Sequence, residues 1–352
     1  MRRIVPSPAA SPPRAVTVEL IRDPTTAGAR IEGFALDAVQ LQTMPFRARR
    51  VTVRLPRMTV VFHAAGVALR SHTSVRAGQV AYVAYGPKSR GTLNGVAVRP
   101  GLLLAAGENA EARLVVEAGW QSVNLLLPPQ DLVAHLRARQ PGEEIQAPKG
   151  LELLQVEPQR VQALFRWGHR LAQAAASRPA LFDARERERA AAEVEGVETL
   201  LAALRGADDL QPSRSDRSRQ AQSRIVQRAE DYALAHAGEP IYVTDLCRAA
   251  AVSERALEVA FKASLGLTPM AYLVRLRLHR ARSALQAARR SGGATVSAVA
   301  LDWGFWHFGE FSRAYKACFG EAPSQTLHRR PGLPRRAETQ TRGDNLSASG
   351  GR

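Results

Sequence analysis

The strongest constraint on this chain is a pattern that occurs twice between residues 241 and 327. Each copy has a small residue on a short amphipathic stretch, Cys247 in the first and Ala300 in the second, 53 positions further on. Four positions later comes another small residue suited to a tight turn, Ala251 or Gly304, and then an apolar residue. This is the pattern of a helix-turn-helix, whose second helix lies in the major groove of DNA. Two copies in register make the prediction much stronger than one copy would.

The second helix of each copy is predicted to bury one face and to expose the other. In the first copy, at residues 253–265, Leu257 and Phe261 take the buried face. Its exposed stripe contains Arg255, Glu258, Val259 and Lys262. In the second copy, at residues 308–319, the inward residues are Phe311, Tyr315 and Phe319, and the outward ones are Gly309, Ser312, Arg313 and Lys316.

These exposed side chains predict how each helix would contact DNA. Arg313 can form two hydrogen bonds with a guanine, and Glu258 can accept one from a cytosine amino group. Contacts with bases are expected from Arg255, Glu258, Val259, Ser312 and Arg313. Contacts with phosphates are expected from Ser253, Lys262, Arg275, His307 and Lys316, because cations and helix N-termini attract phosphate. His307 also stands three residues before Glu310, which is the spacing of a capping box, so a role as helix cap is favoured over a base contact.

The charge of the chain agrees with a polyanionic partner. The formal net charge is +17, and residues 213–336 hold 20 basic and 10 acidic residues. The net charge is weaker evidence than its size suggests, because 45 of the 49 basic residues are Arg, a skew that codon usage can produce.

The pattern along the chain predicts several segments. Residues 15–127 hold short β-type runs between Gly and Pro, which is typical of an all-β sandwich or barrel. Helical periodicity follows, with Val197, Leu200, Leu201 and Leu204 on one face of a helix at 184–204. That stripe either forms a dimer seam, the favoured interpretation, or packs against the β-domain. The predicted segments are a disordered 1–14, a β-rich domain 15–140, a helical dimerisation segment 141–205, a linker 206–223, a DNA-binding domain 224–330 and a disordered tail 331–352.

Within 224–330 we expect a leading helix at 224–237, a first helix-turn-helix at 245–265, a linker helix at 269–288 and a second helix-turn-helix at 296–319. The linker helix is rich in Arg, and Arg275, Arg277, Arg280 and Arg282 are expected on its outer face, where they would hold phosphates.

The region from about residue 220 to 330 resembles the AraC/XylS family of bacterial transcription regulators. The resemblance is carried by Pro269-Met-Ala-Tyr-Leu, Ala300-Leu-Asp-Trp-Gly-Phe, and above all Phe311-Ser-Arg-Ala-Tyr-Lys with Phe319-Gly-Glu-Ala-Pro-Ser. It implies two helix-turn-helix units joined by a long helix, preceded by a cupin-like sensor domain. The expected fold class is therefore α+β with two domains: a β-rich sensor domain with trailing helices, and an all-α DNA-binding domain.

The resemblance also implies a cytoplasmic, nucleoid-associated bacterial regulator that binds double-stranded promoter DNA. An activator's contact with RNA polymerase, a homodimer and a small-molecule effector belong to the same expectation. One departure stands out: the family usually has long polar side chains where this chain has Glu258 and Val259. Val259 could touch a thymine methyl, or the first unit could contribute little base recognition, so more specificity is expected from the second unit.

Two other functions compete with that of a sensing regulator. An architectural DNA-binding protein without a ligand is the main alternative. An enzyme using a reactive cysteine is disfavoured, because Cys247 and Cys318 lie outside the β-domain and have no metal or redox spacing. No catalytic residue, cofactor or metal site is expected, and His63 and His72 have no partner pattern. Ligand-binding residues stay unassigned, although Phe46, Phe62, Tyr82, Tyr85 and Trp120 could line a pocket or simply form core.

The N-terminus reaches Pro6 and Pro8 without a sustained apolar run, so no signal peptide is expected. No apolar stretch approaches the ~18–20 residues of a membrane span. Contact with a membrane is therefore not expected.

Overall fold

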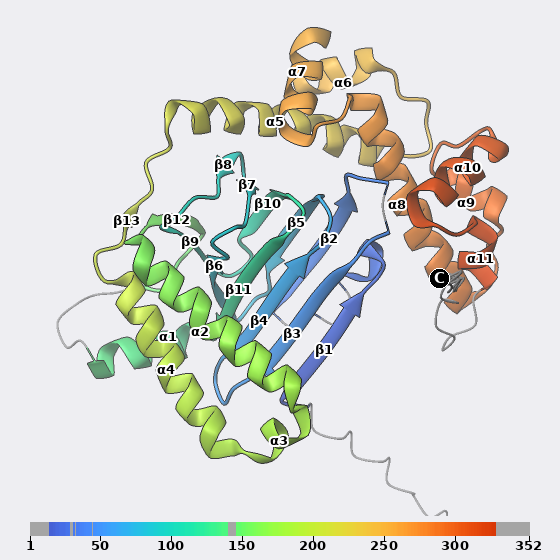
Figure 1. Ribbon diagram of the computed structural model, residues 1–352. Coiled ribbons are helices and arrows are strands. Elements are labelled where there is room, and N and C mark those ends of the chain that lie inside the picture. Colours follow the sequence, from blue (N-terminus) through green and yellow to red (C-terminus); the bar gives the residue numbers. More distant parts are fainter. Residues whose placement is uncertain (1–13, 29–30, 32, 44, 140–145, 329–352) are drawn as a thin grey trace, which may run out of the picture.

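The computed structural model describes residues 14–28, 31, 33–43, 45–139 and 146–328. Nearly all of the segment predicted to be disordered at the N-terminus, and the whole predicted tail, lie outside these residues. Figure 1 shows a β-domain covered by helices on one side, and a helical C-terminal region beside it. The two-domain α+β class predicted from the sequence is confirmed. No helix among the described residues is both long and apolar enough to span a membrane.

The β-domain consists of two antiparallel sheets. The larger has the strand order β1-β3-β4-β11-β6-β9-β12-β13 and the smaller the order β2-β5-β10-β7-β8. Strands β1 to β11 all lie within residues 15–127, where the sequence predicts short β-type runs. The strands are β1 (Val16–Ile21), β2 (Phe34–Gln40), β3 (Ala48–Arg54), β4 (Thr59–Ala65), β5 (Leu69–Val75), β6 (Val80–Tyr85), β7 (Gly91–Leu93), β8 (Val96–Ala97), β9 (Leu102–Ala106), β10 (Glu111–Val116), β11 (Trp120–Leu127), β12 (Leu151–Gln155) and β13 (Asp208–Asp209).

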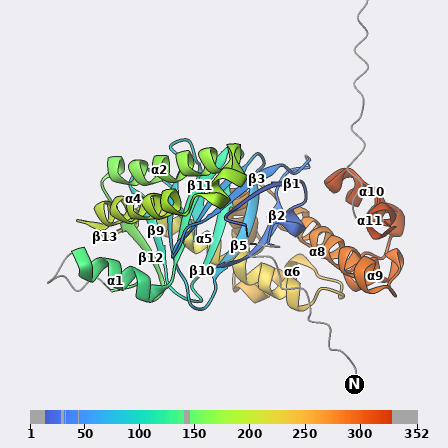
Figure 2. The same ribbon diagram turned by 90° about the horizontal axis from the view of Figure 1, so that it is seen from below.

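Two long helices lie across one face of the larger sheet, as Figures 1 and 2 both show. They are α2 (Pro158–Ser177) and α4 (Glu186–Leu204). Val197, Leu200 and Leu201 of α4 are at most 3% exposed and belong to the core beneath these helices. The stripe on α4 therefore packs inside the protomer, and its favoured interpretation as a dimer seam is wrong. Periodicity shows that a helix face is apolar but not which surface covers it.

Three shorter elements accompany this layer. They are α1 (Pro129–Arg139), α3 (Pro179–Ala184) and the 3₁₀ turn η1 (Pro24–Thr26). The segment 141–205, predicted to be helical, also contains β12, which pairs with β9 of the larger sheet.

The predicted linker 206–223 is largely structured. Strand β13 lies in it, and α5 (Arg214–Ala235) begins ten residues earlier than the expected helix at 224. Ser213 and Asp216 form a capping box that starts α5. The Asp216 carboxylate also binds the Arg99 guanidinium at 2.7 Å, which fastens the start of the helix to the β-domain. The Ser- and Arg-rich composition of residues 206–223 is typical of a linker, because most side chains at the start of α5 face solvent.

The C-terminal helices form two cores joined by one long helix. The first core contains buried residues of α5, α6, α7 and the first half of α8, and the second contains residues of α8, α9 and α10. The first core also takes in Val39 and Leu41 from the β-domain, so the first unit packs directly on that domain. The helices are α6 (Val243–Ala250), α7 (Glu254–Leu265), α8 (Pro269–Ser291), α9 (Val296–Asp302), α10 (Phe308–Phe319) and α11 (Pro323–His328).

Candidate nucleic-acid interface and cavity

Helices α6 and α7 form the first helix-turn-helix as the sequence predicted. Ala251 has a φ of 56°, in the left-handed region, and makes the turn between them. The Ser253 hydroxyl then accepts a hydrogen bond from the Ala256 N–H at 3.3 Å and caps α7. Leu257 and Phe261 are fully buried, which fixes the orientation of the helix.

The other face of α7 is open to solvent. Arg255, Glu258, Val259 and Lys262 are all exposed, and Val259 is 50% exposed. The side chains of Arg255, Glu258 and Lys262 take no part in a hydrogen bond or ion pair with the residues that the structure describes. The four predicted residues therefore share one accessible surface.

Helices α9 and α10 form the second unit around Gly304, whose φ is 73°. Phe311, Tyr315 and Phe319 of α10 are buried, as predicted. His307 takes the N-cap position, but its side chain makes no capping hydrogen bond. The capping-box interpretation of His307 and Glu310 is therefore wrong, and the exposed imidazole stays available for another contact.

The exposed face of α10 holds Arg313 and Lys316, with Ser312 half-buried between them and the core. Two large apolar side chains that the sequence reasoning missed flank it: Trp306 is 57% exposed and Phe308 is 43% exposed. Phe308 stands three positions before the buried Phe311, a spacing that favours the inward face. A signal for its exposure was therefore lacking in the sequence.

The arginines of α8 do not all lie on an outer face. Arg282 is 4% exposed, and its guanidinium binds Asp23 at 2.6 Å and Glu321 at 2.7 Å. Burial alone would lower the pKa of Arg282. The neighbouring acidic groups raise this pKa by a larger amount, so that it lies above its ordinary value. Its predicted role in holding phosphate is therefore wrong. Arg280 pairs with Asp37, and Arg275 is half-buried with Nη1 enclosed and unpartnered among the described residues.

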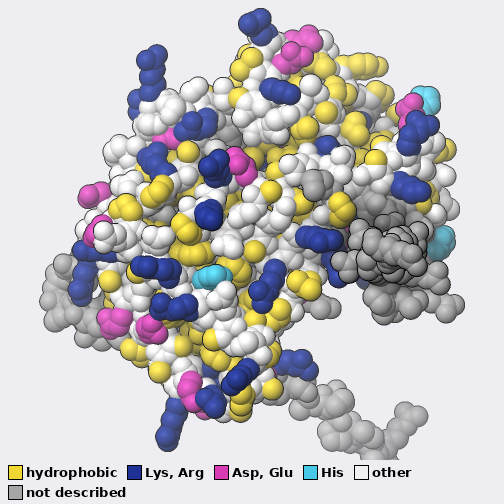
Figure 3. Space-filling view, viewed as in Figure 1, with side chains coloured by type: hydrophobic (Ala, Val, Ile, Leu, Met, Phe, Trp, Pro, Cys, Tyr) yellow, Lys and Arg dark blue, Asp and Glu magenta, His cyan; other side chains and the backbone are white. Residues whose placement is uncertain are grey.

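On the face seen in Figure 3, Lys and Arg side chains are spread over the β-domain and the C-terminal helices alike, with acidic side chains among them. The net charge of the chain therefore does not by itself mark the interface.

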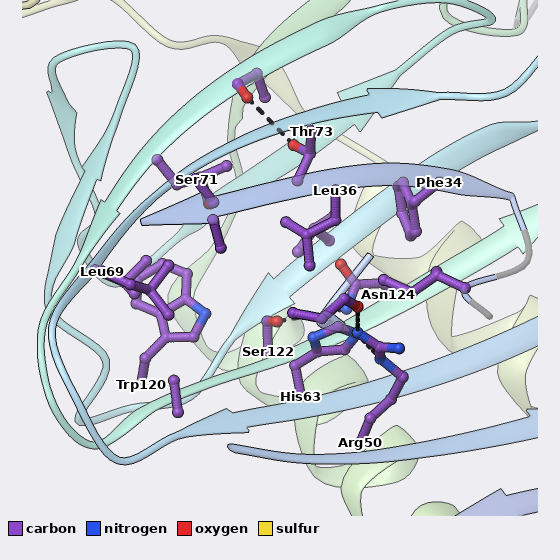
Figure 4. Close-up of a pocket in the computed structure, with 18 of the residues that line it drawn as sticks. Phe34, Leu36, Arg50, His63, Leu69, Ser71, Thr73, Trp120, Ser122 and Asn124 are labelled. Atoms are coloured by element: carbon purple, nitrogen blue, oxygen red, sulfur yellow. Dashed lines mark hydrogen bonds between the residues drawn. The ribbon is translucent and has the colours of Figure 1, made fainter. Parts of the chain in front are cut away.

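A second candidate site lies between the two sheets of the β-domain. A cavity of about 130 Å³ is lined mostly by aliphatic side chains of both sheets. Figure 4 shows Leu36 and Ser71 of the smaller sheet facing His63 and Ser122 of the larger one. Among the aromatic residues singled out in the sequence, Phe46, Tyr85 and Trp120 line the cavity, whereas Phe62 and Tyr82 belong to the core under α2 and α4.

The described residues contain no group of three or more His, Cys, Asp or Glu that could hold a metal ion. Burial raises the pKa of the Cys318 thiol to about 11, and the pKa of the half-buried Cys247 is also raised. Neither cysteine has the lowered pKa of a reactive thiolate.

Comparison with known proteins identifies the helical region. Residues 246–329 match a family model described as a helix-turn-helix domain. The probable thc operon regulatory protein of Rhodococcus erythropolis is 44% identical over 108 residues, 30% of this chain and 32% of that protein. The XylDLEGF operon transcriptional activator 3 of Pseudomonas putida is 36% identical over 107 residues, 30% of this chain and 31% of the activator.

Among solved structures, a probable AraC family transcriptional regulator from Rhodopseudomonas palustris is 38% identical and covers 30% of this chain and 95% of its own, with a TM-score of 0.28. The matches to the two curated relatives span about a third of the length of each.

Proposed function

Because the chain belongs, through the domain in its residues 246–329, to the AraC/XylS family of transcriptional regulators, we propose that it reads promoter DNA with two helix-turn-helix units and senses a small molecule with its β-domain. One observation, common to α7 and α10, carries the proposal. Each helix buries one face in its own core and exposes cations that no described residue neutralises. Free cations on such a helix are available for phosphates and base edges.

The two helices have different tasks in this proposal. Arg313 on α10 forms a bidentate contact with guanine. The hydroxyl of Ser312 beside it can either donate or accept a hydrogen bond with a base edge. On α7, Arg255, Glu258 and Val259 meet bases, but the carboxylate of Glu258 repels phosphate unless it finds a base donor. We therefore assign the greater share of sequence discrimination to α10.

Contacts with phosphate set the register of both helices. Lys262 and Lys316 lie on the exposed faces of α7 and α10, after the residues assigned to base contacts. Ser253 and His307 stand at the N-termini of these helices, where backbone N–H groups attract phosphate. Arg275 is the weakest member of this set, because its guanidinium is partly enclosed.

Contact with RNA polymerase, activation of transcription and homodimerisation belong to the same proposal. Support for activation comes from the names of relatives in Pseudomonas putida, which are transcriptional activators. A dimer would have to use a surface other than the buried stripe of α4.

The test is binding of the full chain to sites selected from a random DNA library. Replacing Arg313 by Ala is expected to cost on the order of 1–3 kcal/mol on the selected site and to relax preference at one base pair. Arg187→Ala is the matched control, because Arg187 is an exposed arginine on α4, far along the chain from the reading helices. The footprint should cover two successive major-groove segments, about 34 Å apart.

Two outcomes would contradict parts of the proposal. If the parent chain bound selected and scrambled DNA equally well, an architectural protein would replace the specific regulator. If Arg313→Ala bound as the parent does, the assignment of Arg313 would be wrong while the regulator remained.

A further inference from the structure

We propose that the cavity of the β-domain binds a small uncharged molecule, about the size of one six-membered ring, that carries a hydrogen-bond acceptor such as a carbonyl oxygen. This inference rests on the proposed sensor role of the β-domain and names the chemistry of the molecule that would be sensed. Three features of the cavity support it: a row of polar side chains in an apolar wall, the charge of that row, and the size of the space.

The polar side chains form one row across four neighbouring strands. Arg50 on β3 pairs with His63 on β4, His63 with Ser122 on β11, and Ser122 with Tyr85 on β6. Residues directly opposite each other on antiparallel strands project from the same face of a sheet. All four line the cavity, so an apolar space has a polar strip along one wall. Arg50, His63 and Ser122 of this strip can be followed in Figure 4.

This strip offers hydrogen-bond donors. The Arg50 Nε–H donates to His63 Nε2 at 3.2 Å, which places the proton of the neutral imidazole on Nδ1. Ser122 Oγ accepts from the Asn124 amide at 3.4 Å, so its own proton is free to be donated. The Tyr85 hydroxyl is buried with no partner among the described residues. A buried hydroxyl without a partner is costly to the protein, and an acceptor on a ligand would satisfy it.

The strip has no spare positive charge. Arg50 is the one charged side chain among the described residues that line the cavity, and Glu19 already pairs with it at 3.1 Å. Burial and the charge of Arg50 lower the pKa of His63 to about 3, so the imidazole is neutral at physiological pH. The other polar side chains of the wall, Ser71, Thr73 and Asn124, are uncharged. An anion entering this space would lose its hydration without gaining a free cation.

The size of the cavity limits the ligand. Its volume of about 130 Å³ is close to that of an engineered cavity of ~150 Å³ in another protein, which stays dry and binds benzene. The ring centroids of Tyr85 and Trp120 lie 5.1 Å apart, so flat aromatic surfaces form the wall of the cavity beside the Tyr85 hydroxyl. A single ring with one short polar substituent fits this space.

The probes are three molecules with the same ring: cyclohexanone, cyclohexane and cyclohexanecarboxylate. Their binding to the full chain is measured by titration calorimetry and by the shift in melting temperature. Cyclohexanone is expected to bind about 2–10-fold more tightly than cyclohexane, the worth of one hydrogen bond. Cyclohexanecarboxylate is expected to bind more weakly than cyclohexanone at neutral pH.

The variant Tyr85→Phe removes only the unpartnered hydroxyl. It should weaken cyclohexanone about 2–10-fold and leave cyclohexane unchanged. Tyr82→Phe is a matched control, since Tyr82 is a buried tyrosine three residues earlier on the same strand that belongs to the core under α2 and α4. It should bind all three probes as the parent does. Ser122→Ala is a second variant of the same strip and should also weaken only cyclohexanone, which keeps the test decisive if Tyr85→Phe fails to fold.

Tighter binding of the carboxylate, equal binding of ketone and hydrocarbon, or no effect of either strip variant would overturn the inference. Absence of binding by every probe would overturn it as well. The proposed function is judged separately by sequence-specific DNA binding: a chain that binds its selected site but none of the probes loses only this inference, whereas one that binds cyclohexanone but prefers no DNA sequence loses the proposed function.

Discussion

Arg280 and Arg282 stand two positions apart on α8 but meet different surroundings. The Arg282 side chain is 5% exposed and holds Asp23 of the β-domain and Glu321 before α11, and its guanidinium also donates to the hydroxyls of Tyr315 and Thr326. The Arg280 side chain is 26% exposed and pairs with Asp37, which is 44% exposed. The same residue type is therefore a buried link between three elements at one position and a surface partner at the other.

Arg282→Ala is expected to destabilise the protein by about 3–5 kcal/mol, because two carboxylates whose side chains are only 16% and 11% exposed would lose their cation. Arg280→Ala should cost about 0–1 kcal/mol, as exposed ion pairs usually do. Urea unfolding of both variants measures the difference in the free energy of unfolding. Equal losses would show that the buried position of Arg282 has no special weight.

At the scale of elements, α4 approaches α2 more closely than any side chain at position 196 would allow. A Cβ at Gly196 would lie 2.4 Å from two atoms of the Trp167 ring and 2.9 Å from Met58. Glycine is a poor helix former, so its place in the middle of α4 reflects this contact. The close approach is what lets the two helices seal the larger sheet together.

Gly196→Ala is therefore expected to cost about 1–3 kcal/mol through overpacking. Gly309→Ala in α10 is the control, since a Cβ there would meet no heavy atom within 4 Å. That variant should unfold at the same denaturant concentration as the parent or slightly above it. Should Gly196→Ala be as stable as the Gly309 variant, the contact with Trp167 would not constrain α4.

At the scale of the whole molecule, the β-domain and the C-terminal helices share buried charges. Arg70 of β5 binds Glu230 of α5 at 2.6 Å, and Tyr272 of α8 donates to the same carboxylate. Burial alone would raise the pKa of Glu230. The charge of Arg70 and its hydrogen bond outweigh this effect, so that the pKa lies below its ordinary value. The pKa of Asp23 is lowered in the same way by Arg282, despite burial. The two carboxylates therefore stay charged in the folded protein at neutral pH.

These shifts predict how stability depends on acid. A carboxylate whose pKa is lower in the folded state contributes stability that is fully present above its unfolded pKa, about 4, and is lost as pH falls through the folded pKa. The contribution of Asp23 and Glu230 should thus be constant from pH 7 to about pH 4 and decline below. Urea unfolding from pH 7 to pH 2.5 measures it.

The double variant Asp23→Asn, Glu230→Gln is the comparison for this prediction. It is less stable at neutral pH but should lose less stability below pH 4 than the parent does. An identical acid dependence of parent and variant would mean that other carboxylates control the decline.

Local features of both units could be predicted from the sequence. The tight turns at Ala251 and Gly304 and the burial of Leu257, Phe261 and Phe311 follow from small residues at the turns and from a 3.6-residue period. The exposed faces of α7 and α10 follow from the same period. The row of Arg50, His63, Ser122 and Tyr85 could not be predicted, because strand register joins residues that are far apart in the chain.

The amino-acid sequence alone settled the identity of the C-terminal domain, since a doubled helix-turn-helix depends on interactions within a few turns of each helix. Contacts between distant segments determine where the stripe of α4 is buried, that α5 starts at Arg214, and that Arg282 points inward toward Asp23. The physical reason is the same in each case. Periodicity shows that a face is apolar or a side chain charged, but the partner that buries or neutralises it is chosen by contacts between distant segments.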